Sequence, residues 1–318
     1  MERIIIDGLS FSLPLFIMAV GGIYSEKSGV TNLALEGFQG MGAFTGALAA
    51  VLLMNAGIGS GMQFCAALLF AVLGGALYSL LHALLSIRMK ANQVISGVVL
   101  NILAMSLTAY LTKALNRGLF GAASDKFVLG VSMRLSIPLL SAMPVLGAFF
   151  KELYPFEIII FAAAIVCWYV LYQTRYGMNL RACGDNPHAV DAAGVNVGGV
   201  RTIAVMLSGA LSGLAGICFA YSISGNFSAS IFMGYGYLAI AAMIFGNWNI
   251  LPTLGSCLLF GFARSGGYYL VQKMQMPSSF ADLAMTLPYV LTLLLLVFFS
   301  GWNRAPRALG EIYDKGKR

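Results

Sequence analysis

Residues 175–194 read RYGMNLRACGDNPHAVDAAG, and this polar stretch separates two apolar segments of the chain. The apolar segments, Glu157–Tyr172 before it and Val200–Tyr221 after it, have the composition of helices that cross a bilayer. Connections between packed helices usually take about 2–8 residues, and this one is more than twice as long. The stretch is therefore expected to carry structure of its own outside the membrane.

A short helix is predicted inside this connection. Asn186 can cap free helix amides, and Pro187 suits the first helical position because that position needs no amide hydrogen. Gly194 stands where a left-handed residue ends a helix, which predicts a helix of about two turns. Such a helix is suited to dock in a groove of another protein and pass on its movement. The flanking glycines that are expected to act as joints are Gly177, Gly184, Gly198 and Gly199.

Outward from this connection, apolar segments dominate the chain. Of its 318 residues, 59% are hydrophobic and only 10% are charged, whereas about a quarter of a soluble domain is charged. So few charges cannot cover a water-soluble globule, and the main solvent is expected to be lipid. The sequence predicts an all-α, polytopic bundle of about 8–10 membrane spans. The candidate spans are Ile4–Tyr24, Glu36–Met54, Gly61–Ile87, Gln93–Leu115, Glu157–Tyr172, Val200–Tyr221, Phe232–Phe245, Leu251–Val271 and Leu283–Ser300.

The basic residues set the expected orientation. Nineteen Lys and Arg against twelve Asp and Glu give a net charge of +7, and short cytoplasmic loops of membrane proteins carry such an excess. Three groups, Arg88 with Lys90, the connection 175–201 and the tail 304–318, fit one side, the cytoplasm. The segment 116–156 and the amino terminus then lie outside. No basic patch with interleaved aromatic residues points to a nucleic-acid partner.

The side chains that could carry enzyme chemistry are few and scattered. The five cysteines form no Cys-x-x-Cys pair, and two histidines offer little for a metal centre or a Ser-His-Asp triad. The chain also lacks the Gly-x-x-x-x-Gly-Lys-Ser/Thr loop that binds the phosphates of ATP. We therefore expect no catalytic residue, no metal site and no cofactor bound by this chain.

Two polar, glycine-containing breaks interrupt the apolar sequence, one at the start of each half. They are Ser25–Asn32 and Ser224–Ser230, and each precedes a helix with spaced glycines. Matching breaks predict two related halves with broken helices and a solute pathway between them, because freed backbone is tolerated only against protein or a water-filled cavity. The candidate pathway residues are Thr31, Asn32, Glu36, Asn92, Gln93, Asn101, Asn226, Phe227, Phe232, Tyr235 and Tyr237.

Several motifs resemble one family of transport proteins. They are SEKSGVTNLALEG at 25–37, KANQVISG at 90–97, LRACGDNP at 180–187, SGALSGLAG at 208–216 and GYGYLAIAA at 234–242. Together they are similar to the permease subunits of bacterial ABC importers, in the branch that contains ribose and branched-chain amino-acid permeases. The resemblance is strongest to the nucleoside-uptake members and covers nearly the whole chain, with its weakest part at 116–156.

The resemblance implies a non-enzymatic permease in the bacterial cytoplasmic membrane. One transmembrane domain is expected, with a first half at about 1–115, an external segment at about 116–156, a second half at about 157–303 and a basic cytoplasmic tail at 304–318. The implied partners are ABC ATPase subunits that use ATP and magnesium, a second permease that is commonly a different chain, and an extracytoplasmic substrate-binding lipoprotein. The segment 178–194 is implied to contact the ATPase, through Arg181, Gly184, Asp185, Asn186, Pro187, His188, Ala189 and Gly194.

Three interpretations stay open from the sequence. Glu36 either stabilises the helix whose first turn it occupies or faces the pathway. The aromatic candidates either stack on a nucleobase or belong to the aromatic belt at the membrane surface. The solute is expected to be a nucleoside, and the alternatives are a simple sugar, a branched-chain amino acid or a vitamin. A more distant alternative is an ion-coupled secondary transporter, which would need paired buried carboxylates and no coupling segment.

Overall fold

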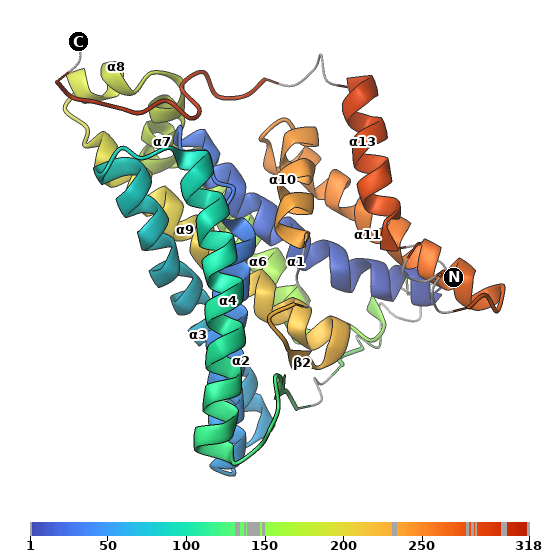
Figure 1. The fold of residues 1–318 in the computed structure, drawn as a ribbon. Helices are drawn as coiled ribbons and strands as arrows, with labels where there is room; N and C mark the ends of the chain where they lie inside the picture. Colours follow the sequence, from blue (N-terminus) through green and yellow to red (C-terminus); the bar gives the residue numbers. More distant parts are fainter. Residues whose placement is uncertain are drawn as a thin grey trace.

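The computed structural model describes residues 2–130, 134–136, 150–230, 234–277, 285–299 and 304–316, together with the single residues 138, 147, 280 and 283. In this part of the chain the fold is a bundle of helices with one antiparallel pair of two-residue strands (Figure 1). The predicted all-α class is confirmed.

The first half contains four long helices. They are α1 (Glu2–Lys27), α2 (Leu35–Asn55), α3 (Ser60–Ala83), which continues as one π-helical turn (Leu84–Arg88), and α4 (Gln93–Phe120). A short strand, β1 (Phe127–Val128), follows in the segment between the halves.

The second half begins with the helix that precedes the polar connection. Its elements are α6 (Pro155–Gln173), α7 (Arg175–Asp185), α8 (Pro187–Ala192), α9 (Val197–Phe219) with a π-helical turn (Ala220–Ser224), β2 (Asn226–Phe227), α10 (Tyr235–Phe245), α11 (Ile250–Lys273) and α13 (Leu287–Phe299).

Each of the nine candidate spans coincides with a helix, in whole or in part. Six of the described helices, α1, α2, α3, α4, α6 and α9, are long and apolar enough to cross a membrane by themselves. Helix α10 has 11 residues, which at about 1.5 Å per residue reaches only about half of a bilayer. A half-length helix directly after a break is what a broken-helix transporter fold requires.

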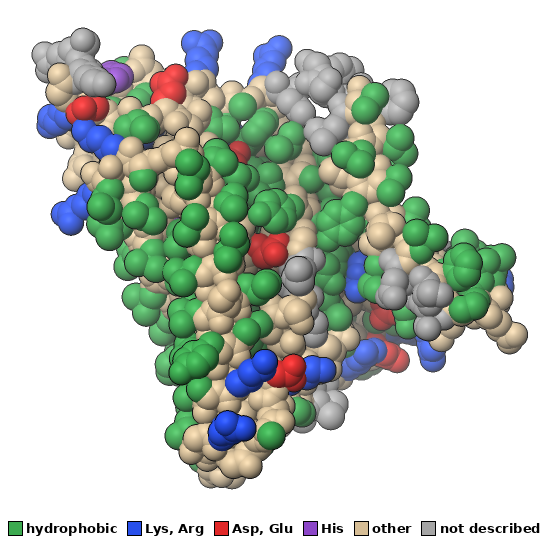
Figure 2. Space-filling view, in the orientation of Figure 1, with side chains coloured by type: hydrophobic (Ala, Val, Ile, Leu, Met, Phe, Trp, Pro, Cys, Tyr) green, Lys and Arg blue, Asp and Glu red, His purple; other side chains and the backbone are tan. Residues whose placement is uncertain are grey.

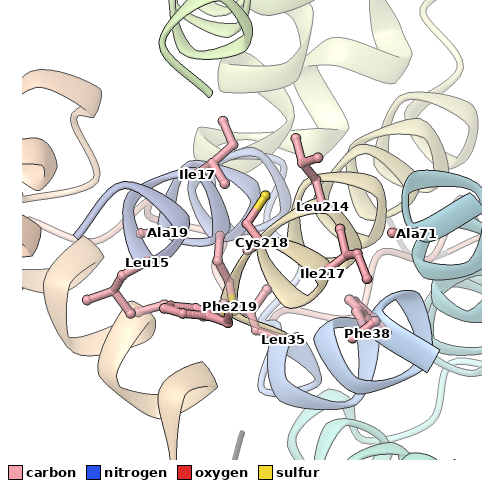
Figure 3. Close-up of a cluster of buried hydrophobic side chains, with 14 of the residues drawn as sticks. Leu15, Ile17, Ala19, Leu35, Phe38, Ala71, Leu214, Ile217, Cys218 and Phe219 are labelled. Carbon is pink, nitrogen blue, oxygen red and sulfur yellow. The ribbon is translucent and has the colours of Figure 1, made fainter. Parts of the chain in front are cut away.

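Helices from the two halves pack against one another in the core. Helices α1 and α9 pack against each other, α1 packs against α11 of the second half, and α9 packs against α3 of the first. Each of α1 and α9 runs into a break that leads to a further helix, α2 or α10. The side chains of α1, α2, α3 and α9 interlock in the shared core (Figure 3).

Small residues let these helices approach closely. A Cβ atom placed on Gly42 of α2 would lie 2.2 Å from the Cα of Gly213 of α9, and one on Gly75 of α3 would lie 2.2 Å from the carbonyl oxygen of Gly209. Backbones can meet at such distances only without side chains. The glycines of the two halves therefore fix α9 between α2 and α3.

On the face shown in Figure 2, most charged side chains lie toward the two ends of the molecule, and hydrophobic side chains with isolated acidic groups cover most of the surface between them. One end carries α7, α8 and residues 304–316 (Figure 1), and we call it the coupling end. The Lys90 ammonium lies 2.8 Å from the Asp314 carboxylate, and the Lys315 ammonium lies 3.6 Å from that of Asp191. The three basic groups thus lie together at one end of the molecule, and their place on the cytoplasmic side stays a prediction.

Candidate functional site

The first break, residues 28–34, lies at the coupling end between α1 and α2. The Thr31 amide donates a hydrogen bond to Oε1 of Gln93 at 2.7 Å, and the Thr31 carbonyl oxygen lies 3.2 Å from Nε2 of His82. The other ring nitrogen of His82 lies 3.0 Å from Oγ of Ser96. Side chains of α3 and α4 thus satisfy backbone that the break has freed.

Asn32 fixes the end of this break through side-chain hydrogen bonds. The side chain is fully buried. Its Oδ1 accepts a hydrogen bond from the Ala34 amide at 3.0 Å, and its Nδ2 donates to Oγ of Ser208 on α9 at 2.9 Å. Asn32 therefore links the break to the second half of the chain.

Glu36 lies where the two halves meet. Its Oε2 accepts a hydrogen bond at 2.9 Å from the amide of Gly234, the residue that directly precedes α10. A Cβ atom placed on Gly236 would lie 2.6 Å from the Glu36 backbone nitrogen. The starts of α2 and α10, 198 residues apart in the sequence, therefore touch, and a carboxylate faces the positive end of α10.

Asn101 on α4 connects the start of α2 to the same place. Its Oδ1 accepts from the Gly37 amide at 2.7 Å, and its Nδ2 donates to the Leu33 carbonyl at 2.7 Å. The same Nδ2 lies 3.4 Å from the hydroxyl oxygen of Tyr237 on α10. The structure thus brings together Glu36, Asn101 and Tyr237 from the predicted pathway set.

A pocket of about 160 Å³ opens beside these three residues, between α2, α4 and α10. The Tyr237 side chain is 46% exposed. Among the described lining residues, Glu36 is the only acidic one and none is basic. The pocket offers a half-buried carboxylate, an amide and an open aromatic ring to a polar solute. Its lining is Glu36, Gly40, Val98, Asn101, Ile102, Ala104, Met105, Thr108, Ala229 and Tyr237.

The second break lies at the other end of the molecule, where β2 follows α9. Phe227 pairs with Phe127 of β1 in the antiparallel register and is fully buried. Its ring centroid lies 6.3 Å from that of Phe127 and 5.9 Å from that of Phe44. Asn226 donates a hydrogen bond to the Ser224 carbonyl at 3.0 Å. Phe227 is therefore a packing residue in this conformation.

The remaining pathway candidates lie apart from the pocket or outside the described residues. The Tyr235 ring packs 5.2 Å from Phe11 and 5.0 Å from Phe219, measured between centroids. Asn92 caps α4 by accepting a hydrogen bond from the Ile95 amide at 3.1 Å. Phe232 lies outside the described residues.

The helix predicted in the long connection is confirmed as α8. Asn186 caps it by accepting a hydrogen bond from the Ala189 amide at 3.1 Å, and Pro187 is its first residue. Gly194 follows the helix with φ of +83°, in the left-handed region. Pro187 and Val190 are buried, whereas His188 and Ala189 are exposed. The helix is thus anchored on one face, while on the other Ala189 is exposed and the His188 ring lies 5.2 Å from that of Tyr313 in the tail, measured between centroids.

The glycines around this connection are not joints, and that expectation is wrong. All four lie inside helices: Gly177 and Gly184 in α7, and Gly198 and Gly199 in α9. A Cβ atom on Gly184 would lie 2.2 Å from the Lys27 carbonyl oxygen. Gly184 therefore allows α7 to touch the end of α1, which is a packing role.

A basic pocket lies beside α7 at the coupling end. Its volume is about 650 Å³. Arg181 lies on its wall with its guanidinium carbon 5.5 Å from the centre of the Tyr172 ring. Among the described residues, the four basic side chains of the lining form no ion pair. The lining is Lys27, Arg181, Asp185, Asn247, Trp248, Arg304, Ala305, Pro306 and Arg307.

Sequence reasoning missed two buried charged groups at this end. Glu26 is buried, and its Oε2 accepts a hydrogen bond from Nε1 of Trp248 at 2.6 Å. Arg201 is 2% exposed, although its charge suggests only a cytoplasmic loop. The available signal was position, because Arg201 is the one charged residue within the apolar α9 segment Val197–Phe219, and ionisable residues in such helices are rare and usually functional.

Known proteins are similar in sequence to this chain over nearly its full length. The family described as "Branched-chain amino acid transport system / permease component" matches residues 4–299. The nucleoside ABC transporter permease protein NupC of Lactococcus lactis is 38% identical, over 100% of this chain and 98% of its own length. The guanosine ABC transporter permease protein NupQ of Bacillus subtilis is 38% identical, over 98% of this chain and 96% of its own length. A second guanosine ABC transporter permease protein of Bacillus subtilis, NupP, is 26% identical, over 95% and 82%.

Proposed function

We propose a function for this chain from one premise: it belongs to the permease family of branched-chain amino acid transport systems. It is a multi-pass transmembrane permease subunit of an ABC transporter in the bacterial plasma membrane. Our proposal is that its solute is a nucleoside and that it works as part of an importer. The observation that carries the proposal is the 38% identity, over nearly the full length of each chain, to permeases named for nucleoside and guanosine transport.

The pocket beside Glu36 supports a nucleoside over the alternatives. A nucleoside needs an aromatic face for its base and hydrogen-bond acceptors for its ribose hydroxyls, and Tyr237 and Glu36 offer these groups. The Glu36 carboxylate accepts backbone hydrogen bonds from Gly234 and Gly236, and because a carboxylate can accept about four hydrogen bonds, it keeps capacity to accept from the solute. A branched-chain amino acid would need a cation for its carboxylate, and the described lining contains none. A simple sugar could use Glu36 but would not need the ring.

The coupling end supports the proposed ATPase partner. Helix α8 exposes His188 and Ala189 while its other face is anchored, which suits insertion into a groove of another subunit. The basic pocket beside α7 suits acidic side chains on that partner. In this proposal, the ATPase binds and hydrolyses ATP with magnesium, and its movement reaches the permease through 178–194.

A second permease and an extracytoplasmic binding lipoprotein complete the proposed importer. Bacillus subtilis has two different guanosine ABC transporter permease proteins similar to this chain, NupQ and NupP. This pairing supports a heterodimer of two permease chains. The pocket lies on a face where α4 leaves large apolar side chains exposed, among them Ile102 and Met105, and a partner permease could cover that face.

Uptake of labelled guanosine by cells that express the complete transporter tests the proposed solute. Unlabelled guanosine is expected to compete, whereas ribose and leucine are not. Tyr237→Ala is expected to lower guanosine uptake by about tenfold, because stacking a base on an aromatic ring contributes about 1–3 kcal/mol. Tyr237→Phe, which keeps the ring, is expected to retain most of the uptake.

Tyr169→Ala is the matched control, since Tyr169 is similarly exposed but lies on α6. Uptake is measured per amount of transporter in the membrane, so that a change in expression does not count. Competition by ribose or leucine in place of guanosine would contradict the nucleoside assignment. Equal uptake by the Tyr237→Ala and Tyr169→Ala variants would contradict the role of the ring.

A further inference from the structure

The buried guanidinium of Arg201 gathers three backbone segments that are far apart in the sequence. Its Nε donates to the Ser28 carbonyl at 2.9 Å, in the first break. Its Nη2 donates to the Cys183 carbonyl at 3.4 Å in α7, and its Nη1 donates to the Glu311 carbonyl at 3.2 Å in the carboxy-terminal tail. The Arg201 side chain therefore forms hydrogen bonds to the first break, to the segment 178–194, which we call the coupling segment, and to the tail.

The tail also contacts the other two segments directly through its backbone. The Ala308 amide donates to the Gly184 carbonyl at 2.8 Å, and the Gly310 amide donates to the Gly29 carbonyl at 3.1 Å. Ala308 is 3% exposed. Residues 308–311 thus lie across α7 and the first break and are hydrogen-bonded to both; we call these residues together with Arg201 the clasp. Figure 1 shows the tail running over the coupling end to α8.

The glycines at this junction are required by its geometry. Gly29 has φ of +91°, and a Cβ atom there would lie 2.5 Å from Nη2 of Arg201. Gly184 lies against the Lys27 carbonyl oxygen and has no room for a Cβ atom. The backbones of α7 and the first break thus pack closely, with the buried Arg201 side chain between them. Such close packing leaves little room for one segment to slide past the other.

Arg201 makes separation of these segments costly. Among the described residues it forms no ion pair, so its direct hydrogen-bond partners are carbonyl oxygens, and the Glu311 carboxylate stabilises its charge from a greater distance. A buried charge that loses its hydrogen-bond partners bears a large desolvation cost. If α7 moved without the break, the guanidinium would lose the Cys183 carbonyl, or it would follow α7 and lose the Ser28 carbonyl. The arrangement therefore favours movement of the three segments as one body.

The first break continues from this junction to the candidate pathway. Past Gly29 and Val30 it reaches Asn32, which is bonded to Ser208 of α9. The Leu33 carbonyl accepts from Asn101, and Glu36 follows at the pocket. A series of buried and part-buried hydrogen bonds, joined by the backbone of the break, thus leads from α7 to the pocket.

We propose that Arg201 and residues 308–311 are positioning elements that clasp the coupling segment to the first break, so that movement of α7 and α8 is transmitted to the start of α2. The proposal rests on the proposed function, because it takes 178–194 as the segment that the ATPase moves. It assigns the tail a role beyond its basic charge, and it assigns Arg201 a role in transmission.

The test uses the complete transporter with its ATPase and partner permease, reconstituted in liposomes, and measures guanosine transported per ATP hydrolysed. Arg201→Gln and a truncation that ends at Pro306 are expected to lower this ratio by at least about fivefold, the low end of coupling factors between sites. ATP hydrolysis itself and assembly of the complex are expected to persist. Ile312→Ala is the matched control with an unchanged ratio, because Ile312 lies in the same tail, outside residues 308–311, and its side chain is 49% exposed.

A second measurement remains informative if a variant assembles poorly. Hydrogen exchange of the wild-type complex is followed with and without ATP, and the peptides that contain 25–34, 178–186 and 304–316 are expected to change protection together. Independent changes in these three peptides would overturn the clasp. An unchanged transport ratio in both Arg201→Gln and the truncation would overturn it as well.

The two proposals fail in different ways. If the wild-type complex transports no nucleoside but transports another solute with ATP, the proposed solute fails, and the clasp is then measured with that solute. If transport is ATP-dependent and the clasp variants keep the wild-type ratio, only the clasp fails. Ala189→Glu, on the exposed face of α8, is expected to block assembly with the ATPase, which separates loss of docking from loss of transmission.

Discussion

The two breaks occupy corresponding places in the two halves, yet they are stabilised by different forces. The first break is held by polar contacts: Asn32 bonds to Ser208, and the Thr31 amide bonds to Gln93. The second break is held by a two-residue strand pair and by the stacked rings of Phe227 and Phe127. The two breaks correspond in position along their halves, but the contacts that stabilise them differ in kind.

This difference matches what each break has to do in the proposed importer. Buried hydrogen bonds are directional and costly to leave unmade, so a break built from them keeps its geometry when a neighbouring segment moves. Burial of the rings in the second break contributes through the hydrophobic effect, which is non-directional and scales with the apolar area removed from water. The first break, at the coupling end, is thus suited to transmission, and the second, at the opposite end, is suited to rearrangement as the solute enters.

The largest expected effect comes from forcing apart the two helices that follow the breaks, α2 and α10, at the point where their starts touch. Gly236→Val places a branched side chain where a Cβ atom would already lie 2.6 Å from the Glu36 backbone. We expect loss of the folded permease or of all uptake, because α2 and α10 cannot both keep their positions. Protein yield, thermal stability in detergent and uptake are the measurements.

Gly255→Ala is the control for this substitution. Gly255 lies within α11, and a Cβ atom there would meet no heavy atom within 4 Å. This variant is expected to fold and transport normally, with a small gain in helix stability. If Gly236→Val also folded and transported normally, the contact between the two halves at Glu36 would be refuted.

An intermediate effect is expected in the second break. Phe227→Ala removes a fully buried ring from between Phe127 and Phe44, and such cavities destabilise proteins by about 3–5 kcal/mol. The free energy of unfolding in detergent measures this loss. Phe227→Leu, which keeps most of the volume, is expected to lose markedly less, and equal losses in the two variants would show that the site is not tightly packed.

The smallest effects are expected when one asparagine in each break is replaced by alanine. Asn32→Ala removes two buried hydrogen bonds, and a cost of about 1–3 kcal/mol in the free energy of unfolding is expected. Asn226→Ala in the second break removes one local hydrogen bond and a buried Oδ1 that has no partner among the described residues. Its expected cost is below about 1 kcal/mol. A larger loss for Asn226→Ala than for Asn32→Ala would reverse the contrast between a polar and an apolar break.

Local patterns predicted the elements of this fold well. The apolar segments became helices, and Asn186 with Pro187 starts α8 where the capping rule places it. The glycines beside this helix were misread, because the sequence cannot distinguish a glycine that bends from one that lets a neighbouring backbone approach. Gly184 is of the second kind, and its partner, the Lys27 carbonyl, is far away in the chain.

The candidate pathway residues show the same limit. Their polar or aromatic side chains in and near the breaks marked all of them alike, but the structure divides them. Asn32 and Gln93 satisfy the backbone of the first break, Asn92 caps a helix, and Glu36 with Tyr237 lines a pocket. A hydrogen-bonding side chain looks the same in a sequence whether its partner is a distant backbone or a solute.

The sequence by itself determined that this protein is helical and surrounded by lipid, that its chain breaks twice, and that three groups of basic residues lie together at one end. These properties follow from composition and local spacing, which act within a few residues. Only the tertiary structure decided that the Glu36 carboxylate meets Gly234, and that Arg201 joins the first break, α7 and the tail. These contacts depend on how the helices of the two halves pack, because close packing and buried hydrogen bonds join groups by distance in space, whatever their separation along the chain.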